Sequence, residues 1–319
     1  MACSSGVLPA DTKATGYFET GWPNGEMMAH CKITVVTPSY NQGQYLEQTM
    51  RSVLEQDYPH KEYMVIDGGS SDASVDIIKR YADRLTYWCS EKDQGQADAI
   101  AKGFERATGD ILCWINSDDI LLPGALRAVA DYFTSHPSVE VVSGGAYYID
   151  EKGKPFKLRL GTYSFGVAAT YGRFKYYAFD GVFQQATFWR RAAYTAVGGI
   201  NRELNFIMDR DLFIRLAGRK RFGRLPKLLA CFRLHAECKS TQLLHVRADE
   251  DRSFARRYGR DAVSGTSRRL LYWRYRIPSL IRKMMLMSLR AIGAVRLERI
   301  QPLCIESDGA AMRRRYTHT

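Results

Sequence analysis

The sequence lacks the features that mark a membrane-spanning protein or a secreted protein held by disulfides. It contains no run of about 18 uncharged apolar residues, so we expect no helix that spans a membrane. Its first residues, MACSSGVLPADTK, have neither the basic nor the apolar region of a secretory signal. Its seven cysteines are odd in number and include no Cys-x-x-Cys pair. Together these absences predict a reduced protein in the cytoplasm.

Two common nucleotide-binding motifs are also missing. No GxGxxG follows the first predicted strand, and no GxxxxGK[ST] occurs, which argues against dinucleotide-binding and P-loop chemistry. No internal repeat at solenoid spacing is present. With 319 residues, 45% of them hydrophobic and 25% charged, the chain is long enough for a large α/β core, with or without an appendage.

Acidic residues are absent between Ala262 and Leu297, where eight Arg and Lys residues lie. The net charge is +12, so the rest of the chain carries only +4 (12 − 8). Aromatic and aliphatic residues alternate with the basic ones, as expected for a helix in a membrane interface. We expect peripheral contact with the anionic inner face of the membrane through residues 268–296. A helix packed on its own domain is the alternative, and no motif indicates a nucleic-acid partner.

Strand and helix patterns alternate regularly from Lys32 onward, which is typical of a mostly parallel α/β sheet with helices on both faces. Strand patterns occupy residues 33–37, 63–66, 85–89, 110–115, 182–189 and 228–234. Helical patterns occupy residues 43–55, 72–81, 95–107 and 204–217 (the last entered through a loop), and a tail from about 247. Pro123 is expected to open one further helix at its first position.

Polar clusters follow the first, second and fourth predicted strands. They begin at Pro38, Asp67 and Asn116. Because ligands of such sheets bind beyond the carboxyl ends of the strands, the three loops predict one shared nucleotide site. The pair Asp118 and Asp119 suits a divalent cation that also binds phosphate, with a helix cap as an equal alternative. Asp67 suits a hydrogen bond to a base N–H, with an Asx turn as its alternative.

The stretches around these clusters resemble the family 2 glycosyltransferases, which are inverting enzymes with the GT-A fold. The resemblance covers residues 32–241 and rests on ITVVTPSYNQGQYLEQTMRSVLEQDYP, VIDGGSSD, SEKDQGQADAIAKGFERATGDILCWINSDD, FWRRAAYTAVGGI, MDRDLFIRLA and FRLHAECKST. The run from Asp93 to Asp98 looks like a version seen in bacterial surface-polysaccharide enzymes. The resemblance implies three regions: a loose extension over 1–31, a GT-A domain over 32–246 with nucleotide-binding (32–122) and acceptor (123–246) halves, and a helical, basic tail over 247–319.

The resemblance also implies a role for each matching residue. Asp209 takes the position of the catalytic base, and Asp119 that of the metal ligand, with His235 completing the metal shell or reaching the diphosphate. The implied cofactor is Mn²⁺ or Mg²⁺. The implied donor-binding residues are Thr37, Pro38, Ser39, Tyr40, Asp67, Gln96, Asp98, Lys102, Ser117 and Asp118.

Two positions depart from the family pattern. Asn116 stands where many members have an aspartate, and Met208 stands where a glutamate precedes the base. Cys231 and Cys238 flank His235, but three ligands at this spacing are a weak indication of zinc.

The expected function is therefore inverting transfer of a sugar from a nucleotide diphosphate, such as a UDP-sugar, to a hydroxyl of a glycan or lipid-linked glycan. A sugar nucleotidyltransferase is one alternative, although it needs a Gly-rich basic loop where Pro38-Ser39-Tyr40-Asn41 stands. A degenerate, non-catalytic nucleotide-sugar-binding protein is the other.

Overall fold

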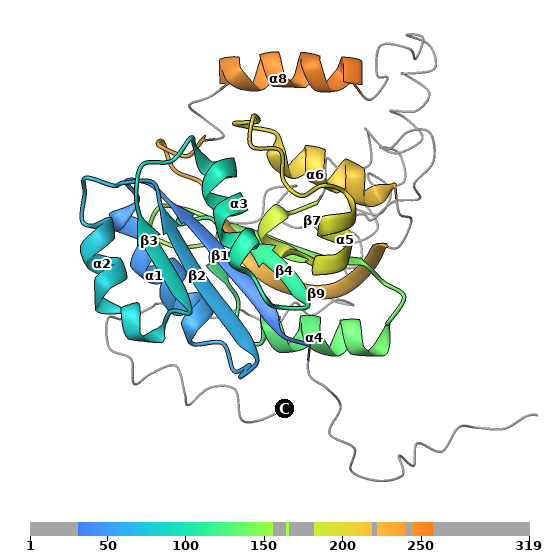
Figure 1. The fold of residues 1–319 in the computed structure, drawn as a ribbon. Coiled ribbons are helices and arrows are strands. Elements are labelled where there is room, and N and C mark those ends of the chain that lie inside the picture. Colours follow the sequence, from blue (N-terminus) through green and yellow to red (C-terminus); the bar gives the residue numbers. More distant parts are fainter. Residues whose placement is uncertain (1–30, 156–163, 166–181, 219–221, 240–243, 258–319) are drawn as a thin grey trace, which may run out of the picture.

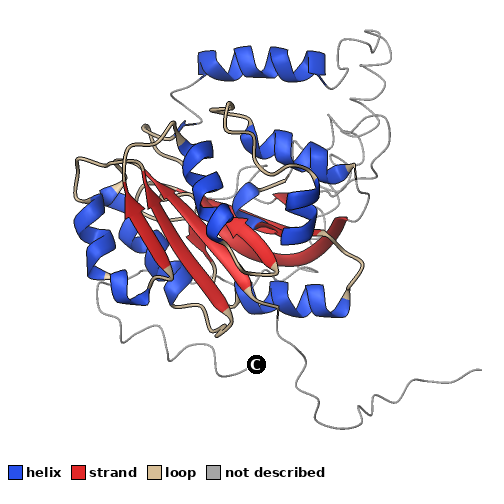
Figure 2. Cartoon of the chain, viewed as in Figure 1, coloured by secondary structure: helices blue, strands red, loops and turns tan. Residues whose placement is uncertain are grey.

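A computed structural model of the protein describes residues 31–155, 164–165, 182–218, 222–239 and 244–257. One mixed sheet lies between two layers of helices (Figure 1; Figure 2). Its strands are β1 (Ile33–Ser39), β2 (Lys61–Asp67), β3 (Tyr87–Ser90), β4 (Ile111–Trp114), β5 (Ile120–Leu121), β6 (Val141–Ile149), β7 (Ser164–Phe165), β8 (Thr187–Arg190) and β9 (Phe222–Arg233). Its helices are α1 (Gly43–Leu54), α2 (Ser74–Arg80), α3 (Gln96–Arg106), α4 (Ala125–Ser135), α5 (Arg191–Ala196), α6 (Met208–Ala217) and α8 (Leu244–Arg257), with 3₁₀ turns η1 (Ala82–Arg84) and η3 (Gln184–Ala186).

The strand order is β3-β2-β1-β4-β8-β6-β9-β5, with β7 paired to β6. The first four strands of this order are parallel, as the alternating strand and helix patterns predict. The second half is mixed, because β8 is antiparallel to β4 and β6, and β5 is antiparallel to β9. The α/β prediction is confirmed, but an all-parallel run of strands is found only in the nucleotide-binding half; in the second half β6 and β9 pair in parallel beside the antiparallel pairs.

Alternate residues of β1 enter two separate cores, one on each face of the sheet. Ile33 and Val35 pack with residues of α1, α2 and α4. Val36 packs with residues of α3, α5 and α6 on the opposite face. Because successive side chains of a strand point to opposite faces, this buried strand reads as an almost continuous apolar run. Both of its faces are covered, so its carboxyl end is held firmly at the edge where the loops gather.

Several predicted boundaries were wrong. Residues 184–186 form the turn η3, and only Thr187–Arg190 is a strand. Helix α4 begins at Ala125, after a turn that contains Pro123 and a left-handed Gly124 at φ 72°. The predicted boundary at residue 247 falls inside α8, whose Phe254 is buried in the second core. We therefore propose that the catalytic domain extends through Arg257.

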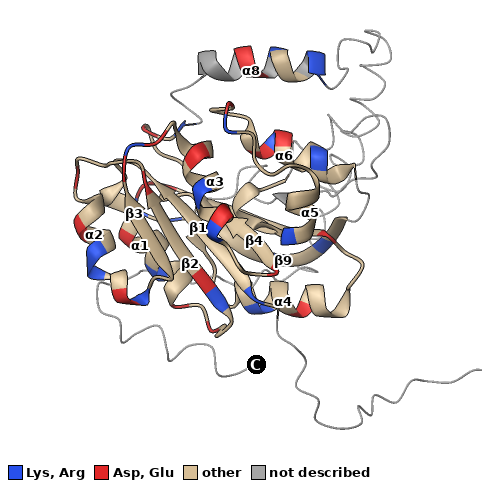
Figure 3. Cartoon of the chain, in the orientation of Figure 1, with Lys and Arg blue, Asp and Glu red and all other residues tan. Residues whose placement is uncertain are grey.

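The charged residues of the described part are scattered over the helices and loops (Figure 3). Among the helices that the structure describes, none combines the length and the apolarity needed to cross a bilayer. The basic segment 268–296, for which membrane contact is predicted, lies outside the described residues.

Candidate active site

A large cavity opens at the carboxyl ends of the parallel strands. Its volume is about 1180 Å³. The loop after β1, the loop after β4, the start of α6 and the segment after β9 all contribute to its lining. The predicted site residues among its lining are Pro38, Ser39, Tyr40, Gln96, Ser117, Asp118 and Asp209. Residues from both halves of the chain thus meet in one cavity, as expected for loops that follow neighbouring strands.

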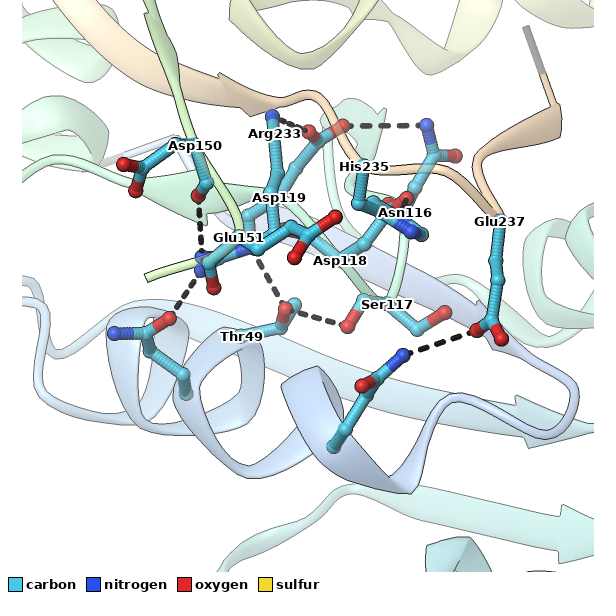
Figure 4. Close-up of polar contacts among 12 residues, drawn as sticks. Thr49, Asn116, Ser117, Asp118, Asp119, Asp150, Glu151, Arg233, His235 and Glu237 are labelled. Carbon is cyan, nitrogen blue, oxygen red and sulfur yellow. Dashed lines mark hydrogen bonds and ion pairs between the residues drawn. The ribbon is translucent and has the colours of Figure 1, made fainter. Parts of the chain in front are cut away.

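The loop after β4 is held between α1 on one side and β9 on the other (Figure 4). Thr49 of α1 donates its hydroxyl to the carbonyl oxygens of Ser117 and Asp119, at 2.8 and 2.7 Å. The fully buried Asp119 carboxylate accepts the Arg233 backbone N–H at 3.0 Å and the Asn116 amide at 3.3 Å. Burial, and then the nearby charge of Asp118, raise the pKa of Asp119. The Asp119 carboxylate therefore has a structural role, because its hydrogen bonds connect the loop to β9.

This position disfavours the prediction that Asp119 is the metal ligand. Its carboxylate does not line the cavity, and both oxygens already accept hydrogen bonds. Asn116 also has a local explanation, because its amide can donate to Asp119 where an aspartate would place two carboxylates together.

Asp118 is the carboxylate of this loop that lines the cavity. One of its oxygens lies 3.0 Å from Nε2 of His235. The His235 ring packs against Tyr45 at a centroid distance of 4.7 Å, and its buried Nδ1 has no hydrogen-bond partner. His235 does not line the cavity, so it contacts Asp118 from behind and orients it.

Asp118 is therefore the residue of this loop to consider as a ligand of a divalent metal. Within the described ranges, no cluster of three His, Cys, Asp or Glu side chains is arranged to hold a metal. Mg²⁺ and similar ions are often held by one or two carboxylates together with substrate phosphates. Asp118 fits that arrangement, whereas a protein-only zinc site with Cys231 and Cys238 does not fit.

Arg233 of β9 braces the loop region, and its role was not predicted from the sequence. Its side chain is buried and donates to the carbonyl oxygens of Asp118, Asp150 and Glu151 at 2.8, 3.1 and 3.0 Å, and also to Gln48. A fully charged group is thus satisfied by neutral acceptors of three segments. The available sequence signal was a charged residue within the apolar run of a strand.

Asp209 occupies the first turn of α6 and lines the cavity. Burial is the main cause that raises the pKa of Asp209, while the Arg210 backbone N–H at 2.7 Å and the charge of Lys239 oppose the rise. A carboxylate with a raised pKa is a better proton acceptor than an ordinary aspartate.

Lys239, another residue missed by the sequence analysis, lines the same cavity. Its ammonium donates to Gln96 at 2.9 Å, and the Gln96 amide donates in turn to Asn116 at 2.8 Å. Burial lowers the pKa of Lys239 to about 8. No carboxylate of the described residues lies within ion-pair distance of this ammonium. A half-buried cation in that setting suits an anionic ligand.

Four predicted donor residues lie outside the cavity lining. Thr37 is buried and shares a 3.0 Å hydrogen bond with the Tyr63 hydroxyl. Asp98 pairs with Arg202 at 3.1 Å, and Lys102 pairs with the exposed Glu91 at 3.1 Å. These contacts support the interpretation of Lys102 as part of a solvated helix face.

The fourth, Asp67, is fully buried. Its carboxylate accepts the backbone N–H groups of Gly69 and Ser70 and the hydroxyls of Ser70 and Ser90, at 2.6 to 3.1 Å. This is the alternative Asx-type turn, and it leaves base recognition to neighbouring backbone or other side chains.

The cavity also gathers most of the unsatisfied polar groups of the described protein. Within the described residues, six buried side-chain atoms lack a hydrogen-bond partner. Four of them belong to cavity-lining residues: Ser39, Gln42, Gln184 and Gln185. Because buried polar atoms are normally paired, this concentration indicates that a polar ligand supplies the missing partners.

A parallel-stranded α/β half with acidic groups at its carboxyl edge, beside a large cavity, is the architecture of the GT-A fold. The sequence matches the family model described as Glycosyl transferase family 2 over residues 34–197, and the chain belongs to this family.

Relatives and solved structures agree with this placement. The chain is 39% identical over 90 residues to the putative teichuronic acid biosynthesis glycosyltransferase TuaG of Bacillus subtilis, covering 27% of this chain and 36% of the relative. It is 33% identical over 111 residues to hyaluronan synthase of Streptococcus pyogenes, covering 32% and 26%. The crystal structure of S. aureus TarS 1–349 has a similar fold, with a TM-score of 0.52, 19% identity, and coverage of 63% of this chain and 60% of TarS. The matched segments thus span about a third or less of these two curated relatives.

Proposed function

We propose that this chain transfers a sugar from a nucleotide diphosphate to a hydroxyl of a glycan or lipid-linked glycan, with inversion at the anomeric carbon. The observation that carries the proposal is that Asp118 and Asp209, from different halves of the chain, line one cavity. One carboxylate suits the leaving-group side of a displacement and the other suits the acceptor side. An inverting displacement requires a single base, which Asp209 supplies.

The leaving diphosphate needs its negative charge balanced as the sugar–oxygen bond breaks. Asp118 is the residue that would hold a divalent metal, and such a metal would supply electrostatic stabilisation of the phosphates. Lys239 adds a second positive group, positioned by Gln96. Its ammonium is therefore proposed to contact a phosphate oxygen of the donor.

Asp209 is proposed to remove the proton of the acceptor hydroxyl. Its burial raises its pKa, which brings a carboxylate closer to the range useful for a base. Met208, which replaces the family's glutamate, is buried in the second core. It also lines the cavity, but a thioether cannot serve as a base, so Asp209 is the proposed base of this pair.

UDP is the nucleotide to test first. TarS structures in complex with UDP and with UDP-GlcNAc share the fold of this chain, at 20% and 18% identity and a TM-score of 0.52 for each. The name of TuaG associates it with teichuronic acid biosynthesis. These comparisons support a UDP-sugar donor and a role in polysaccharide biosynthesis, whereas the proposed contact with the inner face of the membrane rests on the basic segment 268–296.

The test is release of UDP from a panel of UDP-sugars with Mn²⁺, with and without glycan acceptors, for the wild type and Asp209→Asn. The wild type should turn over at least one donor. The variant should lose about 10²-fold or more of its transfer rate, because proton removal by a positioned base is worth that much. Its donor affinity should remain and its Tm should not fall, because burial opposes the charge that the substitution removes.

The acid limb of the wild-type pH–rate profile gives a second readout. Asp209 accepts a proton only when ionised, so activity should fall as the pH drops through its pKa, at a higher pH than for an ordinary aspartate. Full transfer by Asp209→Asn would contradict the base assignment. Absence of any UDP-sugar turnover by the wild type would contradict the proposed donor.

A further inference from the structure

Two adjacent glutamines of the turn η3 are buried, and contacts within the protein satisfy their amides only in part. Gln184 and Gln185 are only 8% and 5% exposed, and both line the cavity. Oε1 of Gln184 and Nε2 of Gln185 are buried and have no hydrogen-bond partner. The protein thus carries an unsatisfied acceptor and an unsatisfied donor on consecutive residues, which costs free energy unless a ligand pairs with them.

The turn that carries the two glutamines is held rigidly. Nε2 of Gln184 donates to the carbonyl oxygen of Trp114 at 2.7 Å, which directs its Oε1 away from β4. The hydroxyl of Thr187 donates to the Phe183 carbonyl at 2.6 Å and to Ser143 at 3.0 Å. An amide held in one orientation can select among ligands by the positions of their hydroxyls.

Aromatic rings lie beside the amides on the cavity wall. The Tyr148 ring packs edge-on against both Phe183 and Phe232, with centroid distances of 5.5 Å, and all three residues line the cavity. A sugar ring has apolar C–H faces and an edge of hydroxyls, so it matches a wall that combines rings with amides. The cations that line the cavity, Lys92, Arg210 and Lys239, lie on other segments than the amide pair and these three rings, and Lys239 is assigned above to the donor's diphosphate.

We propose that Gln184 and Gln185 bind adjacent hydroxyls of the donor's sugar ring and favour a neutral hexose over a uronic acid. One hydroxyl donates to Oε1 of Gln184, and its neighbour accepts from Nε2 of Gln185. The link from Gln184 to Trp114 holds the pair against β4, the strand whose following loop carries Asp118. Because the transferred sugar is bonded directly to the diphosphate, it must lie near this loop. The inference rests on the proposed nucleotide-sugar donor.

The test measures affinity by titration calorimetry with Mg²⁺ present. The probes are UDP, UDP-glucose, UDP-galactose, UDP-N-acetylglucosamine and UDP-glucuronic acid. The wild type should bind one of the neutral UDP-sugars about tenfold more tightly than UDP, as expected for one or two buried hydrogen bonds. Gln185→Leu should bind UDP as the wild type does and lose the tenfold advantage of the sugar. Gln94→Leu, which replaces an exposed glutamine outside the cavity lining, is the control and should behave as the wild type.

Thermal unfolding without ligand separates recognition from a structural role. Gln185→Leu should keep its Tm or raise it by about 2–4 °C, because it removes an unsatisfied buried amide. Gln184→Leu should lose the same sugar selectivity but lower the Tm, because the Trp114 carbonyl loses its donor. A structural glutamine would instead lower the Tm in both variants.

The outcomes distinguish this inference from the proposed function. If the wild type binds no UDP, the proposed donor is wrong and this inference falls with it. If the wild type binds UDP but Gln185→Leu keeps the preference for the sugar, only this inference is overturned. It is also overturned if the wild type favours UDP-glucuronic acid, or binds every UDP-sugar no more tightly than UDP.

Discussion

At the scale of single residues, Asp118 and Asp119 are adjacent in sequence but lie in different environments. Asp118 lines the cavity and contacts His235, whereas Asp119 is fully buried beneath the loop. The sequence places both after β4 but does not show which one is covered. That depends on Arg233, more than a hundred positions away, whose backbone N–H binds Asp119.

Substitutions of the two aspartates should therefore have different effects on metal-dependent binding and on stability. Asp118→Asn should keep a wild-type Tm and lose the part of UDP affinity that depends on Mn²⁺, because it removes the carboxylate that faces the cavity. Asp119→Ala should lower the stability by about 1–3 kcal/mol, because it leaves two buried donors without an acceptor. Calorimetry with and without Mn²⁺, together with thermal unfolding, measures both effects. Loss of metal-dependent affinity in a stably folded Asp119→Ala, with Asp118→Asn unaffected, would restore Asp119 as the ligand.

At the scale of elements, the sequence predicted the strands of the nucleotide-binding half far better than those of the acceptor half. The former are apolar runs bounded by turn residues, and local patterns identify them. Strand β6 was missed because Gly144 and Gly145 interrupt its apolar residues. In the structure this interruption is a packing feature. A Cβ on Gly144 would lie 2.5 Å from Leu229 of β9, so the glycine permits the two strands to approach.

The register of β9 is fixed partly by Arg233, which ends that strand. Arg233→Met should lower the stability by at least about 2 kcal/mol, because three backbone carbonyl oxygens lose the buried guanidinium that donates to them. It should also weaken donor binding, because Asp118 belongs to the braced loop. Urea unfolding and UDP titration measure the two effects. Arg190→Met is a matched control, because Arg190 also donates to backbone carbonyls but lies outside the cavity lining. It should lose stability and keep UDP affinity; if both variants keep full UDP affinity, the brace has no role in the site.

At the scale of the whole molecule, the positive charge is distributed unevenly along the chain. The eight basic residues between Ala262 and Leu297 account for two thirds of the net charge of +12.

The domain itself is bounded by contacts that sequence patterns did not reveal. Glu250 of α8 accepts the backbone N–H groups of residues 205–207, just before α6, at 2.6 to 3.0 Å. This joins α8 to the segment that presents Asp209.

These contacts indicate where the chain can be divided to test the proposed membrane contact apart from the domain. A chain that ends at Arg257 keeps α8 and the hydrogen bonds of Glu250 to residues 205–207, and it lacks the basic segment 268–296. In flotation with liposomes that contain anionic lipid, the full chain should float and the shortened chain should remain at the bottom. Each basic residue near such a surface contributes about 1 kcal/mol, so eight of them suffice for stable binding at low salt. Raising the salt should release the full chain, since the attraction is electrostatic. The shortened chain should retain UDP binding, which shows that it is folded. Equal flotation of the two chains would locate any membrane contact in the domain instead of the basic segment.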